Sequence, residues 1–372
     1  MIKNTDVNKF VNLKHKVLPK PNQRDLLDHS KILQNQVSKY SFATKKGISL
    51  KRNVPPKSSE NQDSYIASPK MMGYNFLHLF AICDGHGTNG HKASNFLRNT
   101  LPKELKNRLQ EETRSNGSQS LDISKLAEQG KCPLSQDMYN LFVNSFLDTN
   151  DSLIRQEFDT KFSGSTCCAL LIYEKKIFCA NVGDSRCILI RIPNLKQRLA
   201  ENSHSSRVQK SSEDAKELKI TVLELSRDHK PDDHDERERI ESNGGEIQSY
   251  INSKGICVGP KRVWVKNHNF PGLAMSRSFG DEIASRVGVS ACPEIKETTL
   301  THEDAYIVIA SDGVWEFLEN KEVAEIVYEY YVQGNAEKAA EAIVKEAFDR
   351  WKNREIIVDD ITCIVLFLDI KD

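Results

Sequence analysis

The sequence predicts an α+β fold, in which antiparallel strands and helices form separate layers. Three apolar runs of strand length, 165–173, 176–182 and 186–192, follow one another closely along the chain. The segments between them are short enough for hairpin turns, so we expect the three runs to pair as an antiparallel meander. Helical spacing of apolar residues occurs before and after these runs. Hairpin-linked strands with interspersed helices favour layered sheets over alternating βαβ units.

Other segments extend this pattern in both directions. Further strands are expected at 75–83, 219–225, 305–310 and 361–368, which are short apolar runs bounded by turn-forming residues. Helices are expected where apolar residues recur three or four positions apart. Their apolar faces consist of Met138, Leu141, Phe142 and Phe146; of Val323, Ile326, Val327, Tyr330 and Tyr331; and of Ala340, Ile343, Val344, Ala347, Phe348 and Trp351.

Charge and composition indicate one large domain preceded by a basic arm. The 372 residues carry 52 basic and 52 acidic side chains, a balance that argues against a nucleic-acid-binding protein. Residues 1–50 are rich in lysine, and we expect them to form a loosely ordered or peripheral extension of a domain at 51–372. The stretches at about 111–131 and 195–217 are polar, which predicts exposed insertions.

The sequence also indicates an intracellular protein, cytoplasmic or nuclear, without a transmembrane segment. Its apolar runs are far shorter than the roughly 20 residues of a membrane-spanning helix. The first residues, MIKNTDVNKF, lack the apolar core of a signal peptide. The nine cysteines include no CxxC pair, and most stand in strand-like runs. This pattern is typical of reduced core residues rather than of disulfides or a zinc site.

Aspartates stand at the ends of several expected strands. An apolar run leads into Asp84, Asp184 and Asp312, and Asp359 closely precedes the last strand. Asp63 stands ahead of an early strand. One such residue is typical of a turn, but several at one sheet edge would repel one another unless a cation lay among them. Oxygen ligands of this kind favour Mg²⁺ or Mn²⁺.

The stretch CDGHG adds a histidine to this set. A pair of divalent ions can lower the pKa of a water molecule and direct it at a phosphorus atom. The leaving oxygen then needs a proton, and His86, two residues after Asp84, is a residue type that titrates near neutral pH. Taken alone, Asp-Gly-His-Gly is more typical of a turn after a strand than of a site.

A series of motifs occurs in order along the chain: ENQDSY, CDGHG, GSTCCALLI, ANVGDSR, SRDHKPDD followed by ERERIESNGGEI, LAMSRSFGD, ASDGVWEFL and DDITCIVLFL. Together they resemble the type 2C metal-dependent serine/threonine protein phosphatases from about Ser58 to Leu368. The resemblance implies a single catalytic domain of two antiparallel sheets packed face to face, with helices on both outer faces (four layers, α-β-β-α). It also implies a two-metal centre at one end of this sandwich.

The resemblance assigns roles to the matching residues. Asp84 would bridge two Mg²⁺ or Mn²⁺ ions, and Gly85 would offer its carbonyl oxygen to one of them. Asp312 and Asp359 would complete the shell. His86 would be the general acid.

A third, weaker ion is implied beside this pair. Asp184 and Asp312 match its ligands in the family, and Glu316 would take the place of an acid that follows the SDG motif. Asp63 matches an acidic residue that contacts the water molecules on the metals.

Two positions depart from the family pattern. Many members have an arginine five residues before Asp63 that grips the substrate phosphate, but Ser58 stands there, with Lys57 beside it. Lys57 could hold a phosphate as a point charge, without the bidentate fork of arginine. Gln62 stands where many members have glutamate. Neither change alters a matched metal ligand, so we expect activity to survive with altered affinity for phosphate.

The segment from Asp228 to about Lys261 matches the flap of the family, which lies beside the active site and influences substrate choice. Its alternative is an ordinary charged helix and loop on the surface. We expect His229 to be structural, and Ser276 and Arg277 to organise the loop that leads to Asp281, a supporting residue of the site.

The expected activity is hydrolysis of phosphoserine and phosphothreonine on proteins, by in-line attack of a hydroxide that bridges the two ions. Phosphoproteins are the expected partners, and no regulatory subunit is expected to be obligatory. A pseudophosphatase that uses the fold only for binding is the main alternative, although no metal carboxylate is missing. A cysteine phosphatase needs a phosphate-cradling loop at its cysteine, which Cys83 lacks. A phosphatase of the haloacid-dehalogenase type needs an Asp-x-Asp nucleophile, which CDGHG does not supply.

Overall fold

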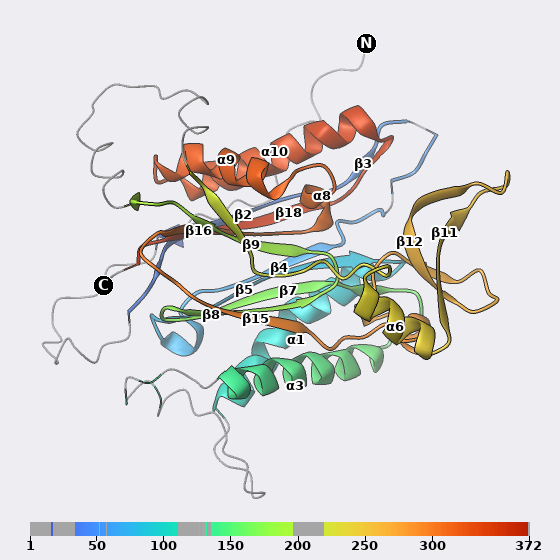
Figure 1. Cartoon of the computed structure of the whole chain (residues 1–372), viewed down its shortest axis with the longest axis horizontal. Coiled ribbons are helices and arrows are strands. Elements are labelled where there is room, and N and C mark those ends of the chain that lie inside the picture. The colour runs from blue at the N-terminus through green and yellow to red at the C-terminus, as the bar shows by residue number, and fades with distance from the viewer. Residues whose placement is uncertain are drawn as a thin grey trace, which may run out of the picture.

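A computed structural model of the chain describes residues 16–17, 34–51, 53–56, 58–110, 126, 129, 131, 135–195 and 219–370. Two antiparallel sheets pack face to face, and helices cover the outer face of each (Figure 1). The α+β class and the four-layer arrangement expected from the sequence are thereby confirmed.

The first sheet brings the two ends of the described chain together. Across the sheet its strands are β1 (Lys16–Val17), β2 (Val37–Lys45), β18 (Ile361–Leu368), β16 (Asp304–Ala310), β9 (Arg186–Arg191) and β10 (Thr221–Glu224). All neighbours in it are antiparallel. Because both faces of β18 are covered, this strand is apolar almost throughout and buried along its whole length.

The second sheet contains the strand that ends in the DGH motif. Its order is β14 (Phe279–Gly280), β6 (Gly164–Ser165), β5 (Leu77–His86), β7 (Cys167–Tyr173), β8 (Lys176–Val182) and β15 (Glu294–Thr299), and β4 (Asp63–Ser68) also pairs with β5.

The expected meander is correct for β7 and β8 but wrong for its third strand. β9 lies in the first sheet, beside β16 and β10, and does not pair with β8. The segment 183–185 therefore carries the chain from one sheet to the other rather than through a hairpin. Gly183 allows this crossing, because its φ of 102° is open to glycine and strained for other residues.

Three apolar clusters separate the four layers. The cluster between the sheets includes Phe80, Ile307 and Ile364. A second joins the first sheet to α9 (Asn320–Tyr331) and α10 (Ala336–Arg354), and a third joins the second sheet to α1 (Gly90–Gln110) and α3 (Ser135–Ile154). Figure 1 shows α9 and α10 above the sandwich and α1 and α3 below it.

Local signals explain where the outer helices begin. A capping box formed by Glu319 and Glu322 starts α9, and the side chain of Asn335 accepts the backbone N–H of Lys338 at 3.0 Å to start α10. Both helices, and α3, lie where the apolar spacing predicts them. α1 carries only a narrow buried stripe and has Pro102 in its interior, which is why the sequence did not reveal it.

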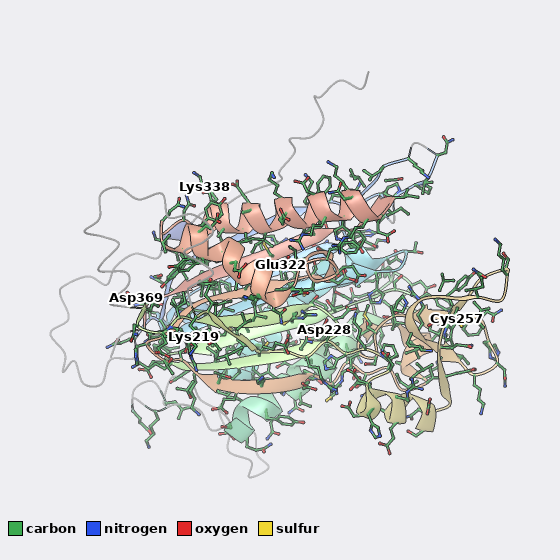
Figure 2. The ribbon with its side chains drawn as sticks, turned by 45° about the horizontal axis from the view of Figure 1, so that its top comes forward. Lys219, Asp228, Cys257, Glu322, Lys338 and Asp369 are labelled. Carbon is green, nitrogen blue, oxygen red and sulfur yellow. The ribbon has the colours of Figure 1, made fainter. Side chains whose placement is uncertain are left out.

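A smaller unit projects from the side of the sandwich. It contains α6 (His234–Ser242), the hairpin of β11 (Gly245–Ile251) and β12 (Cys257–Val265), β13 (Pro271–Leu273) and α7 (Glu282–Ser285). Ile240, Val263 and Val287 belong to its own apolar cluster. Figures 1 and 2 show the hairpin extending away from the sheets, with Cys257 out on it and Asp228 nearer the sandwich. The remaining short elements are η2 (Met71–Gly73), β3 (Ile48–Ser49), α8 (Asp312–Trp315) and β17 (Ile357–Val358).

The expected N-terminal extension at 1–50 is wrong in its last part. β2 lies inside the first sheet between β1 and β18, and its Tyr40 and Phe42 are buried in the core between the sheets. The lysines at its two ends concealed this strand in a sequence segment rich in basic residues. The expected insertion at 111–131 lies almost entirely outside the described residues. The expected insertion at 195–217 also lies outside them, apart from Leu195. Among the described helices, none has the length and hydropathy to cross a membrane.

Candidate active site

The aspartates at the strand ends are positioned by both sheets. β4 and β5 pair so that Asp63 lies directly opposite Asp84. Asp184 follows β8, Asp312 is the first residue of α8 after β16, and Asp359 precedes β18. The ends of strands therefore position five carboxylates from distant parts of the sequence.

Burial and neighbouring carboxylates raise the pKa of two of these aspartates. Burial raises the pKa of Asp84 well above its usual range, and Asp312, Asp63, Asp359 and Asp184 raise it further, in that order. Burial also raises the pKa of Asp63 well above its usual range, with a further contribution from Asp359. An arrangement of this kind is costly unless a cation or protons neutralise it.

The donor set fits a hard divalent cation. Oδ1 of Asp63 and Oδ1 of Asp184 are buried, and neither accepts a hydrogen bond within the described part of the chain. Buried polar atoms nearly always have a hydrogen-bond partner or an ion, so we expect these two oxygens to bind one. No three Asp, Glu, His or Cys side chains of the described residues are arranged to hold an ion between them. Mg²⁺ suits such a set, because it keeps several of its own water molecules.

Gly85 is fixed by a close approach of three chain segments. Its N–H donates to the carbonyl oxygen of Gln62 at 3.1 Å. A Cβ atom at this position would lie 2.2 Å from the carbonyl oxygen of Gly90 and 2.6 Å from that of Gln62. Only glycine fits there, and the contact holds Asp84 and His86 in place on either side.

Two further residues hold the carboxylates in position. Asp360 accepts the backbone N–H of Gln62 at 2.7 Å, and its own N–H donates to Oδ1 of Asp359 at 2.9 Å. The hydroxyl of Ser311 donates to Oδ2 of Asp63 at 2.9 Å. The sequence analysis did not single out Asp360, although the doubled aspartate before the last strand was a visible signal.

His86 is paired with Asp281. Its Nε2 lies 2.5 Å from Oδ2 of Asp281, and the hydroxyl of Ser278 donates to the same oxygen at 2.6 Å. Asp281 is almost fully buried and has a φ of 44°, a left-handed conformation that is rare outside glycine and concentrated at functional sites. Burial lowers the pKa of His86, but the Asp281 carboxylate outweighs this, and the net pKa is raised. Nδ1 of His86 is buried and has no hydrogen-bond partner among the described residues.

Two residues expected to bind a third ion, Asp184 and Glu316, differ in burial. Asp184 is buried and pairs with Lys230, whose Nζ lies 2.6 Å from its Oδ2. Burial lowers the pKa of Lys230, but Asp184 outweighs this effect and the net pKa is raised. Glu316 is exposed, at the C-terminal end of α8. The sequence analysis missed Lys230, although it stands in the DHKP motif.

The positions that depart from the family pattern have other contacts. The Ser58 hydroxyl accepts the backbone N–H of Glu60 at 3.1 Å. Gln62 is buried, and its Nε2 donates to the carbonyl oxygen of Gly87 at 2.7 Å, which supports the loop after His86. Lys57 lies outside the described residues.

The base of the flap is held by a fully buried glutamate that the sequence analysis missed. Glu236 on α6 accepts hydrogen bonds from Arg239, Arg277 and Ser276. Burial would raise the pKa of Glu236, but these bonds hold it far below its usual range. His229 is also fully buried, and its Nδ1 accepts a backbone N–H at 3.1 Å.

Comparison with known proteins supports one family throughout. The family model for protein phosphatase 2C matches residues 56–355. Probable protein phosphatase 2C 72 of Arabidopsis thaliana is 33% identical over 297 residues, which cover 79% of this chain and 77% of that protein. Probable protein phosphatase 2C 35 of the same plant is 29% identical over 321 residues, 82% of this chain and 78% of that protein.

A solved structure supports the same fold. The serine-threonine phosphatase 2C from Toxoplasma gondii superposes with a TM-score of 0.65 and 17% sequence identity, covering 96% of this chain and 99% of that chain. Residues 56–355, which the family model matches, include Asp63, Asp84, Asp184, Asp312 and the DGH segment, whereas Asp359 lies just beyond them. The chain therefore belongs to the protein phosphatase 2C family and is a metal-dependent serine/threonine protein phosphatase.

Proposed function

We propose that the chain hydrolyses phosphoserine and phosphothreonine on proteins by direct in-line attack of water, with two Mg²⁺ or Mn²⁺ ions held by Asp84, Asp312, Asp359 and the carbonyl oxygen of Gly85. The single observation that carries this proposal is that strand ends of both sheets place four other carboxylates around Asp84, close enough to raise its pKa. When bound, such ions lower the pKa of a water molecule and stabilise negative charge on the phosphoryl group.

The carboxylates that do not ligate directly have supporting roles. Asp63 has one buried oxygen without a partner, while its other oxygen is held by Ser311. This fixed orientation suits a residue that accepts hydrogen bonds from water molecules of the metal shell. Asp184 is arranged in the same way: its Oδ1 is buried without a partner among the described residues, and its Oδ2 accepts from Nζ of Lys230. A third ion at Asp184 and Glu316 would then compete with the Lys230 ammonium group.

His86 supplies the proton for the leaving oxygen of the serine or threonine. An alkoxide is a poor leaving group, so protonation by a positioned acid accelerates this step. Asp281 accepts from Nε2 of His86 and fixes the orientation of the ring. The opposite nitrogen, Nδ1, has no hydrogen-bond partner among the described residues, so it is the ring nitrogen that would donate the proton.

No covalent phosphoenzyme is needed in this mechanism. Cys83, the cysteine nearest to the DGH motif, is fully buried within β5 and cannot act as the nucleophile. Pairing of His86 with a buried aspartate likewise suits proton donation rather than attack on phosphorus.

The test is release of phosphate by the chain alone, after removal of metals, from a phosphoserine protein and a phosphothreonine protein. Mn²⁺ or Mg²⁺ should start turnover with both, and excess chelator should stop it. A phosphotyrosine protein serves as the control and should be a far poorer substrate. Turnover that persists in chelator, or a folded chain inactive on both substrates at saturating metal, would contradict the proposal.

A further inference from the structure

A cavity of about 330 Å³ opens at the side of the sandwich, between β2, β4 and α1. Its lining includes Tyr40 and Phe42 of β2, Tyr65 of β4, and Arg98 and Pro102 of α1, but none of the carboxylates of the active site. This volume lies within the range of small-molecule binding sites.

Arg98 gives the cavity a positive charge that no described carboxylate neutralises. It is the only charged residue of the lining. Its neighbour is Tyr65: the guanidinium carbon of Arg98 lies 4.8 Å from the centre of that ring. No carboxylate of the described residues forms an ion pair with Arg98. Arg98 is exposed, at the rim of the cavity. A guanidinium group without a paired acid is a favourable partner for a carboxylate or a phosphate group.

Two tyrosine hydroxyls add neutral donors to this charge. Burial raises the pKa of Tyr40, and the neighbouring Tyr65 raises it further. Burial also raises the pKa of Tyr65, although Arg98 works in the opposite direction. Both phenols therefore keep their protons at neutral pH and can donate hydrogen bonds. Phe42 stacks on Tyr65 with ring centres 3.9 Å apart, which holds the Tyr65 ring in place.

Pro102 interrupts the backbone hydrogen bonding of α1 beside the cavity. Pro102 has no N–H, so it cannot bond the carbonyl oxygen of Arg98 four residues earlier, as a helical residue normally would. A proline in a helix interior is costly, but here it also presents an apolar ring to the cavity.

We propose that this cavity binds a small organic anion, whose carboxylate or phosphate group lies at Arg98 and the hydroxyls of Tyr40 and Tyr65. The apolar body of the ligand packs against Phe42 and Pro102. The site is separate from the metal centre, so binding does not require Mg²⁺ or Mn²⁺ and does not depend on the proposed catalytic mechanism.

The test is calorimetric titration of the full chain with two probes, benzoate for a carboxylate and phenylphosphonate for a phosphate-like group. Each titration is done with Mn²⁺ present and again with chelator, and benzyl alcohol serves as the neutral probe. We expect one saturable site for at least one anion that persists in chelator, with benzyl alcohol binding at least about tenfold more weakly. The anion that binds more tightly identifies the preferred group.

Variants connect this binding to Arg98. Arg98→Gln should weaken binding at least about tenfold, whereas Arg98→Lys should retain part of it, because the charge remains. Arg108→Gln is the matched control on the same helix: Arg108 pairs with Asp148 outside the cavity lining, and binding should not change. If Arg98→Gln does not fold, the comparison rests on Arg98→Lys and the neutral probe. Absence of saturable binding, binding lost in chelator, equal binding by Arg98→Gln, or equal binding of benzyl alcohol would overturn the proposal.

Discussion

Nε2 of His86 lies 2.5 Å from Oδ2 of Asp281, an aspartate 195 positions further along the chain. The two residues come from β5 of the second sheet and from the loop that follows β14. Ser278 donates to the same carboxylate oxygen, and the left-handed backbone of Asp281 aims that oxygen at the imidazole ring. Proton donation in the proposed mechanism therefore depends on a residue outside the DGH motif.

Asp281→Asn should impair catalysis without weakening substrate binding. The amide can keep a hydrogen bond to His86 but loses the charge that holds the ring in its protonated form and orientation. We expect kcat on a phosphoserine peptide to fall by about 100-fold with little change in KM. On an aryl phosphate with a good leaving group the loss should be much smaller, because that group needs no proton.

Glu282→Gln is the neighbouring control for Asp281. Glu282 accepts from the hydroxyl of Thr160 and does not contact His86. Its substitution should leave both rates close to wild type. If Asp281→Asn lowered kcat equally on both substrates, a role for Asp281 in positioning the acid would be wrong.

Lys230→Gln tests whether the Lys230 ammonium group and a metal ion compete for the Asp184 carboxylate. The buried Asp184 carboxylate loses its partner, so the metal-free chain should lose about 1 kcal/mol of unfolding free energy, a modest value because Lys230 is partly exposed. Mn²⁺ should then raise the melting temperature of the variant more than that of the wild type. Thermal unfolding over a series of Mn²⁺ concentrations measures this.

Lys176→Gln provides the comparison for Lys230. Lys176 pairs with Glu297 on the edge of the second sheet, at a site with no other relation to the metals. Its response to Mn²⁺ should match that of the wild type. An Mn²⁺ response of Lys230→Gln no larger than this control would refute the competition.

Stability should fall in acid because of His78. This residue is fully buried in β5, where Nδ1 accepts the backbone N–H of Lys70, and burial lowers its pKa to about 4. The folded state therefore binds a proton less readily than the unfolded state, whose histidine has a pKa of about 6.5. Above pH 6.5, protonation of His78 does not reduce the free energy of unfolding. As the pH falls toward 4, it lowers this free energy by up to about 3 kcal/mol.

Urea unfolding at pH 7 and at pH 4.5 tests this expectation. His78→Asn keeps an acceptor for the Lys70 amide but cannot take up a proton, so its free energy of unfolding should change less between the two pH values. His268→Asn, at an exposed position, should behave like the wild type. An unchanged pH dependence in His78→Asn would show that other groups cause the acid sensitivity.

Local patterns predicted most of the strands and the aspartates that follow them. β8 and β18 lie where the apolar runs placed them, because strands buried on both faces have an unambiguous composition. β2 was missed because its lysines resemble those of the preceding residues, and its burial depends on pairing with β18, more than 300 residues away. A strand whose partner lies so far along the chain has little signature of its own.

The chemistry of the site was predictable only as far as single motifs reach. CDGHG and ASDGVWEFL pointed to Asp84, His86 and Asp312, because each motif joins an apolar strand to a reactive side chain. The contacts of Lys230 with Asp184 and of Glu236 with Arg277 were not predicted, since each pair joins segments that only the folded chain brings together. The motifs therefore predicted the acidic residues, whereas their partners could be identified only from the structure.

The measurement that tests the metal centre most directly compares Asp84→Asn with the wild type in two experiments, Mn²⁺ titration by calorimetry and thermal unfolding without metal. Asp84 lies among carboxylates that repel it, so a neutral side chain of the same shape should stabilise the metal-free chain, on the order of 1 kcal/mol or more. The same variant should lose the tight Mn²⁺ sites and phosphatase activity. A variant that melts higher but no longer binds Mn²⁺ is the predicted result, whereas Mn²⁺ binding equal to the wild type would contradict a metal centre at Asp84.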